Sequence, residues 1–103
     1  MYSKVYTLKF PSLEAAKIGV GHLSQELGGS IADSNIVSLS ILLHKDGNVT
    51  LLARFDTLQD MQEFERLQKT ILQTLESVFN LREIVQRSAV AVFVFDREAT
   101  SIT

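Results

Sequence analysis

The stretch from Asn35 to Asp56 constrains the fold more than any other part of the sequence, because its side chains alternate on both sides of a turn. It reads NIVSLSILLH, then KDGN, then VTLLARFD, which predicts two antiparallel strands. Gly47 follows Asp46 at the centre, and glycine takes a positive φ at no steric cost. We therefore expect a β-hairpin that turns at these two residues.

Two closures of this hairpin give different registers. A two-residue turn pairs Lys45 with Asn48 and places Thr50 and Arg54 on the apolar face of the preceding strand. A three-residue loop pairs His44 with Asn48 instead. This register makes one wholly apolar face from Val37, Leu39, Ile41, Leu43, Val49, Leu51, Ala53 and Phe55. A slip of one residue turns every side chain over, so burial selects the three-residue loop.

The chain before the hairpin predicts a strand and a helix. Residues 2–10 alternate as a half-buried strand that Pro11 ends, although Lys4 falls among the apolar side chains of one face. A helix begins after the N-cap residue Ser12, and we expect the two glycines at 28–29 to stop it.

The chain after the hairpin predicts a longer helix and a last strand. Apolar residues at spacings of three and four follow the N-cap residue Thr57 as far as about Phe79. Residues 80–87 suit either a last helical turn or a packed loop. Residues 88–96 are apolar on both faces, which is typical of a strand covered on both sides, and residues 97–103 are expected to form a loose tail.

The order strand, helix, strand, strand, helix, strand predicts a single ferredoxin-like α+β domain over residues 1–103. Right-handed crossovers give a four-stranded antiparallel sheet in the order 4-1-3-2, with both helices on one face. We expect Phe93 and Phe95 to face the helices. The other face then carries Val5, Thr7, Lys9, Ile36, Ser38, Ser40, Leu42, Thr50, Leu52, Arg54, Val90, Val92 and Val94.

This second face is about half apolar, and two helices cannot cover it. Burial at about 25 cal/mol per Å² favours covering it, most simply with a second copy of the chain. We expect a homodimer with these interface residues: Val5, Ile36, Leu42, Leu52, Val90, Val92 and Val94. A monomer with a solvated mixed face is the alternative.

Arg54 is the most specific candidate for ligand binding, because a buried arginine needs an anion or good acceptors. Together with neighbouring hydroxyl and apolar groups it would suit an amphipathic acid, such as a fatty acid or an aromatic acid. The expected ligand-binding residues are Arg54, Ser38, Ser40, Thr7, Leu52, Val90 and Val92. A salt bridge to the partner subunit and a solvated side chain are the alternatives.

Composition and motifs exclude several classes of function. A net charge of -2, and aromatic residues expected on the helix side of the sheet, argue against a nucleic-acid binder. No cysteine is present, and no apolar run approaches the roughly 20 residues of a membrane span, so we expect a cytoplasmic protein. His22 and His44 have no metal-ligand spacing and are expected at the surface, so no metal or cofactor is predicted.

Gly19 and Gly21 are unusual inside a helix, where each costs about 1 kcal/mol relative to alanine. Close packing of the helix on the sheet would explain them. Alternatively, the missing side chains leave room for a ligand.

The element order and strand patterning of residues 2–96 resemble the dimeric α+β barrel superfamily, which includes antibiotic-biosynthesis-monooxygenase-like proteins. The matching features are the apolar-faced strands at 36–43 and 89–95 and the long helix at 57–79. The resemblance implies two sheets paired in a barrel, with clefts for apolar or aromatic small molecules. It transfers no catalytic residue, because the chain has no Trp, and no His in the second helix.

Three functions are therefore considered. The first is a homodimer that binds an apolar or amphipathic small molecule at or beside the sheet interface. The second is a cofactor-free monooxygenase acting on an aromatic or polyketide-like substrate. The third is a regulatory ligand-sensing module of the ACT type, which shares this topology.

Overall fold

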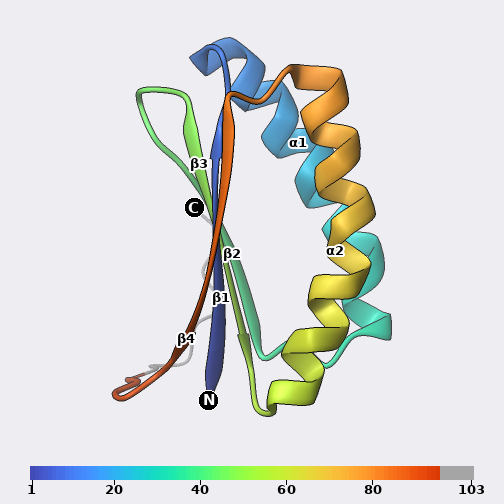
Figure 1. The fold of residues 1–103 in the computed structure, drawn as a ribbon, viewed down its shortest axis with the longest axis vertical. Coiled ribbons are helices and arrows are strands. Elements are labelled where there is room, and N and C mark those ends of the chain that lie inside the picture. Colours follow the sequence, from blue (N-terminus) through green and yellow to red (C-terminus); the bar gives the residue numbers. More distant parts are fainter. Residues whose placement is uncertain (96–103) are drawn as a thin grey trace.

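The computed structural model describes residues 1–95 of the chain, apart from the side chain of Asp33. The elements are β1 (Tyr2–Lys9), α1 (Leu13–Ser30), η1 (Ile31–Asp33), β2 (Ser38–Leu43), β3 (Asn48–Phe55), α2 (Leu58–Phe79) and β4 (Glu83–Val90). The four strands form one antiparallel sheet in the order β2-β3-β1-β4, and both helices cover the same face (Figure 1). The predicted ferredoxin-like fold and strand order are confirmed.

The β2–β3 hairpin has the predicted three-residue loop. The backbone N–H of His44 donates to Asn48 O at 2.9 Å, and that of Gly47 donates to His44 O at 3.1 Å. Gly47 has a φ of 89°. Leu43 therefore lies opposite Val49, as burial of the apolar face requires.

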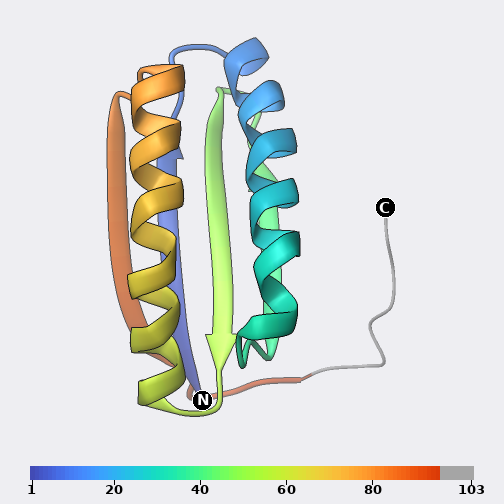
Figure 2. The same cartoon turned by 90° about the vertical axis from the view of Figure 1, so that its right-hand side faces the viewer.

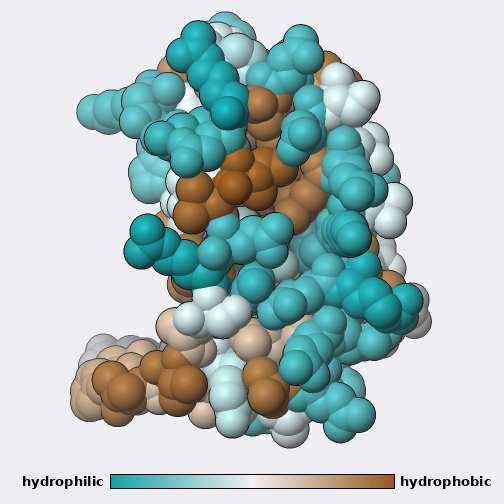
Figure 3. All heavy atoms as spheres, viewed as in Figure 1, coloured by the Kyte–Doolittle hydropathy of each residue, from teal (hydrophilic) through white to brown (hydrophobic). Residues whose placement is uncertain are grey.

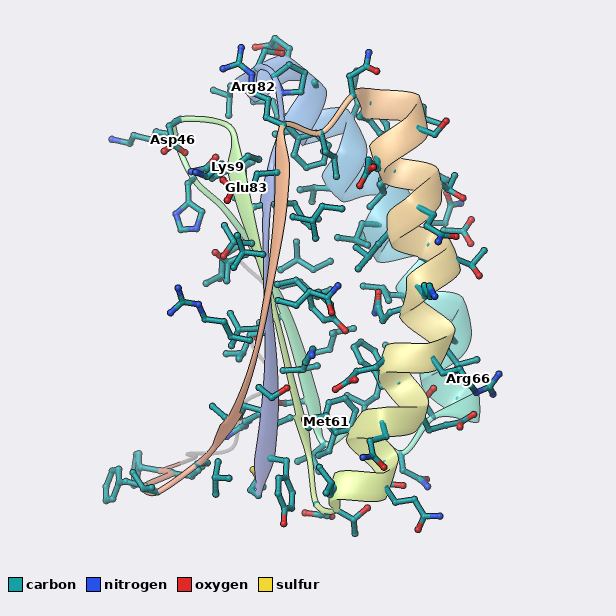
Figure 4. The ribbon with its side chains drawn as sticks, in the orientation of Figure 1. Lys9, Asp46, Met61, Arg66, Arg82 and Glu83 are labelled. Carbon is teal, nitrogen blue, oxygen red and sulfur yellow. The ribbon has the colours of Figure 1, made fainter. Side chains whose placement is uncertain are left out.

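The hydrophobic core lies between the sheet and the helices, with α1 packed on β2 and β3, and α2 packed on β1 and β3 (Figure 2). Phe64 of α2 contacts two aromatic rings of the sheet: its centroid lies 5.1 Å from that of Phe55 and 6.4 Å from that of Tyr6. Met61 also points toward the sheet (Figure 4). The buried apolar residues are Tyr6, Leu8, Phe10, Ala16, Leu23, Leu27, Val49, Leu51, Ala53, Phe55, Met61, Phe64, Leu72 and Leu75.

Both predicted N-caps are confirmed. Ser12 Oγ accepts from Ala15 N at 3.1 Å, and Thr57 Oγ1 accepts from Asp60 N at 3.1 Å. The predicted stop of the first helix at residues 28–29 is wrong, because α1 continues to Ser30. Buried Leu27 anchors this last turn, and its carbonyl accepts the Ser30 hydroxyl at 3.0 Å. The second helix ends at Asn80, which is left-handed with a φ of 52°.

The predicted position of the last strand is wrong by about five residues. β4 spans Glu83–Val90 rather than residues 88–96, so most of 80–87 is strand and not a helical turn or loop. Among the described strands it pairs with β1 alone, from Lys9 opposite Glu83 to Tyr2 opposite Val90. One further hydrogen bond follows this pair, from Ala91 N to Met1 O at 2.9 Å.

This shift changes which side chains are buried. Phe93 and Phe95, predicted to face the helices, are 85% and 71% exposed. Val90 lies opposite Tyr2 and so belongs to the helix side, and Val92 and Val94 follow the strand rather than lying on its open face. The predicted strand end at residue 96 and the tail at 97–103 lie outside the described residues.

The start of β2 also differs from the prediction. Ile36, predicted on the open face, packs against the core, whereas Val37, predicted in the core, is 44% exposed. Regular alternation begins only at Ser38, where β2 starts, so the pattern could not be extended back to these two residues. Among the described helices, none is both long and apolar enough to span a membrane.

Candidate functional site

The sheet face that points away from the helices (Figure 1), here called the open face, carries apolar and polar side chains in alternation. Neighbouring strands line up its residues in rows across the sheet. One row is Ser38, Arg54, Ser3 and Ala89; the next is Ser40, Leu52, Val5 and Arg87; the third is Leu42, Thr50, Thr7 and Val85. At the far end Lys9 Nζ lies 2.8 Å from Glu83 Oε2 (Figure 4).

The predicted Arg54 site forms only in part. Arg54 Nε donates to Ser38 Oγ at 2.6 Å, and the arginine takes part in a further interaction as well. Thr7 lies two rows away, opposite Thr50, so the structure does not bring it to the guanidinium. Ser3, opposite Arg54, is the hydroxyl that the sequence analysis missed. The ligand-binding role of Arg54, Ser38, Ser40, Thr7 and Leu52 remains a prediction.

Arg87 is a second residue that the sequence analysis did not place on the open face. It lies opposite Val5, in the same row as Leu52. The misplaced last strand concealed it, and counting the pairing back from the length of β1 would have found it. Two arginines therefore lie on the open face, Arg54 on β3 and Arg87 on β4.

The segment 91–95, here called the arm, leaves the end of β4 and turns away from the helices (Figures 1 and 3). Its start is fixed, because Ala91 N donates to Met1 O at 2.9 Å. Val92 and Phe93 are 96% and 85% exposed. The arm thus places several large apolar side chains in solvent within a short segment.

A groove of about 420 Å³ lies between α2 and β4, on the helix side of the sheet. Figure 3 shows its apolar floor, surrounded by hydrophilic side chains. Tyr6, Leu72 and Ile84 supply the apolar lining. The polar lining consists of Glu65, Lys69, Gln73, Glu76 and Gln86.

A buried lysine lies next to this groove. Lys4 Nζ lies 3.2 Å from Glu65 Oε1, donates to Ser88 Oγ at 3.2 Å, and is 5.8 Å from the centroid of the Tyr6 ring. Burial, and secondarily the charge of Glu65, raises the pKa of Tyr6 well above its usual 10.0. The Tyr6 hydroxyl is thus a neutral group at physiological pH. The signal in the sequence was Lys4, the charged exception on an apolar strand face.

The two helical glycines and the two histidines were the other candidates for a functional role. A Cβ on Gly19 would lie 2.4 Å from Phe10 Cε2, which confirms close packing at that position, whereas one on Gly21 would meet nothing within 4 Å. His22 lines a small hollow of about 180 Å³, and the ring of the exposed His44 hydrogen-bonds to Thr50 Oγ1 at 2.8 Å. Within residues 1–95 no group of His, Cys, Asp and Glu side chains has the arrangement of a metal site.

Solved structures with the same fold are numerous. A dimeric ferredoxin-like protein from an uncultured marine organism superposes with a TM-score of 0.73 at 14% identity, covering 93% of this chain and 91% of that one. A putative antibiotic biosynthesis monooxygenase from Deinococcus radiodurans gives 0.74 at 14% identity, covering 96% and 100%. One from Nitrosomonas europaea gives 0.74 at 11% identity, covering 90% and 100%.

These similarities agree with the resemblance seen in the sequence, and at such low identity they show a shared fold. The sequence matches no protein-family model, and a search of curated proteins finds no match.

Proposed function

We propose that the chain forms a homodimer through its open sheet faces, and that each protomer binds a small molecule with an apolar body in the groove between α2 and β4. The observation that carries the ligand site is the groove itself, whose apolar floor is bordered by hydrogen-bonding side chains. Pairing of the sheets would give the dimeric α+β barrel expected from the sequence.

The open face supports the dimer through four apolar side chains on its four strands. Val5, Leu42, Leu52 and Val85 lie in adjacent rows there, and Leu42 is 50% exposed. Burying such groups against a second copy is favourable at about 25 cal/mol per Å². A protein of similar fold is described as a dimeric ferredoxin-like protein, which supports the pairing of two copies.

The arm adds a second apolar surface to the same interface. It projects to the open-face side, where Val92 and Phe93 have little contact with their own protomer (Figure 1). In a face-to-face dimer these side chains pack on the partner. The interface role predicted for Val92 and Val94 is thus kept, although the residues reach the partner from the arm and not from a strand.

The groove favours a particular kind of ligand. Its floor of Tyr6, Leu72 and Ile84 suits an aromatic or aliphatic body. Gln73 and Gln86 at the border, with the neutral Tyr6 hydroxyl, suit hydroxyl and carbonyl groups of the ligand. Two carboxylates and one lysine also border the groove. An anionic ligand should therefore bind less favourably there than at the open face, which carries Arg54 and Arg87.

A retained ligand would show which site is used. Native mass spectrometry of freshly purified protein is expected to show a dimer carrying a small molecule. Gln73→Trp, which fills the groove, should remove the ligand, whereas the matched control Gln62→Trp on an exposed part of the same helix should keep it. Retention in both variants, with loss in Arg54→Ala, would place the ligand at the open face instead.

Cofactor-free oxygenation is the second candidate, favoured by the Glu65 carboxylate beside the groove. A carboxylate there can accept a proton from a phenol or an acidic C–H of the substrate. The resulting phenolate or carbanion adds O₂ to form a substrate hydroperoxide, which loses water to leave a carbonyl, so the substrate itself supplies both electrons. Proteins of similar fold are described as putative antibiotic biosynthesis monooxygenases. Oxygen uptake with a panel of polyphenols, lost in Glu65→Gln, would support this activity, and no uptake with any of them would exclude it for that panel.

A further inference from the structure

A second hollow lies between α1 and α2 and shares no lining residue with the groove. It measures about 370 Å³. Its apolar walls are Leu27, Phe64, Leu67 and Ile71. Gly29 forms part of the border, and a Cβ there would meet nothing within 4 Å, so the glycine leaves this part of the wall open.

Gln68 lines this hollow and has no protein partner. Its side chain is buried, with the residue only 1% exposed, and neither its Nε2 nor its Oε1 makes a hydrogen bond. An amide buried in this way costs about 1–3 kcal/mol relative to one that is paired. Such a residue is unexpected at a core-facing position of α2, where Phe64 and Leu72 flank it one turn away on either side.

A second polar atom lines the same hollow. Ser34 Oγ is also buried and also lacks a hydrogen-bond partner. The two side chains come from different parts of the chain, one from α2 and the other from the connection that follows η1. Both residues thus line one space, and their hydrogen-bonding groups have no protein partner, which points to an occupant that completes them.

We propose that this hollow binds a small neutral molecule with a hydrogen-bond donor and acceptor side by side, such as a lactam or a primary amide. The Gln68 amide can donate to the carbonyl of such a group and accept from its N–H, a pairing that two amides make reciprocally. Ser34 offers one further hydroxyl. Glu26 is the one charged residue in the lining, which disfavours an anion.

The test uses the whole ¹⁵N-labelled chain with 2-pyrrolidinone as the lactam probe. Titration followed by NMR should move the Gln68 side-chain amide signals in a saturable way. Gln68→Leu should weaken binding about tenfold or more, since both hydrogen bonds are lost. Gln62→Leu, the same change at an exposed position of α2, should leave the affinity unchanged. Cyclopentanone, which lacks the N–H, should bind more weakly than the lactam.

Two results would overturn the proposal. Saturable binding of equal strength in Gln68→Leu would mean that the amide does not recognise the probe. Absence of any saturable shift with both 2-pyrrolidinone and acetamide would mean that the hollow holds water alone. Neither result bears on the groove, because Gln68 and Ser34 are not among its lining residues.

Discussion

Gly19 and Gly21 show that the effect of a glycine on stability depends on what surrounds it. Both lie in the interior of α1, where glycine is unfavourable by about 1 kcal/mol relative to alanine. Only Gly19 is in contact with the core: Phe10, 4% exposed, occupies the space that a Cβ would need. The Phe10 ring is itself held edge-on by Phe79, with 5.7 Å between centroids.

Alanine substitution is expected to have opposite effects at the two glycines. Gly21→Ala should raise the free energy of unfolding by about 1 kcal/mol through helix propensity. Gly19→Ala should lower it by about 1 kcal/mol or more, because displacing the Phe10 ring outweighs that gain. Urea unfolding measures both, and the double variant Gly19→Ala with Phe10→Leu should recover stability relative to Phe10→Leu alone. Equal effects of the two alanines would contradict the packing contact.

Tyr6 should make the protein sensitive to alkaline pH. Its pKa in the folded protein is raised above the usual 10.0, so the folded state binds its proton more tightly than the unfolded state. The stability that this proton binding gives to the folded state is therefore fully present below about pH 10 and is lost as the pH rises further. The loss amounts to about 1.4 kcal/mol per pH unit while only the unfolded chain is ionised.

The check is the pH dependence of urea unfolding between pH 9 and 11. Tyr6→Phe should flatten it, whereas Tyr2→Phe, at a half-buried tyrosine outside the groove, should keep the wild-type slope. An unchanged slope in Tyr6→Phe would assign the alkaline loss to other groups.

Among the elements, the β2–β3 hairpin connects the sheet to the start of α1. A Cβ at Gly47 would lie 3.0 Å from the carbonyl carbon of Ser12, the N-cap residue. Phe10 N also donates to Gly47 O, at 3.4 Å. The loop therefore packs against the beginning of the helix.

Gly47→Ala should destabilise the protein by about 1–2 kcal/mol from its left-handed backbone alone, with the contact to Ser12 adding to the loss. Lys45→Ala, an exposed position in the same loop, should change stability by less than about 0.5 kcal/mol. Chemical denaturation of both variants is the measurement. A neutral Gly47→Ala would show that the loop can adopt another turn without cost.

The elements that could be predicted from the sequence are those whose limits are set locally. The hairpin was predictable in register, because only one closure buries an apolar face, and α2 carries its own cap and periodicity. β4 was not, because its ends depend on which residues of β1 remain to be paired. The apolar run at 88–96 has the pattern of a buried strand, but β4 ends at Val90, opposite Tyr2.

The candidate sites divide in the same way. The side chains of the open face alternate, so Arg54 and Ser38 were brought together correctly. The groove and the hollow form where α2 and other elements do not pack closely. The residue pattern of a single element does not predict such spaces. Gln68 in particular reads like any polar residue beside an apolar stripe, and only its burial without a partner distinguishes it.

For the whole molecule, the proposed dimer would bury one of two neighbouring leucines and leave the other in solvent. Leu42 is on the open face and 50% exposed, whereas Leu43 is on the helix side and 42% exposed. A lysine at the first position would be buried in the dimer without a partner, and at the second it would stay in solvent.

Leu42→Lys should therefore yield monomers, whereas Leu43→Lys should remain dimeric with little change in affinity. Analytical ultracentrifugation at micromolar concentration distinguishes the two results. If both variants stay dimeric, the open face is not the interface; if the unmodified protein is a monomer, the proposed barrel is wrong.

The pairing of β1 also has a consequence for how the chain folds. This strand comes first in the sequence yet lies inside the sheet, and both of its neighbours come much later: Lys9 is opposite Asn48, and Tyr2 is opposite Val90. Bringing such distant residues together costs entropy before any hydrogen bond is gained, which slows folding. During synthesis β1 has no strand to pair with until β3 has been made. Its other edge stays unpaired until β4 has been made, so the sheet can be completed only after the last strand leaves the ribosome.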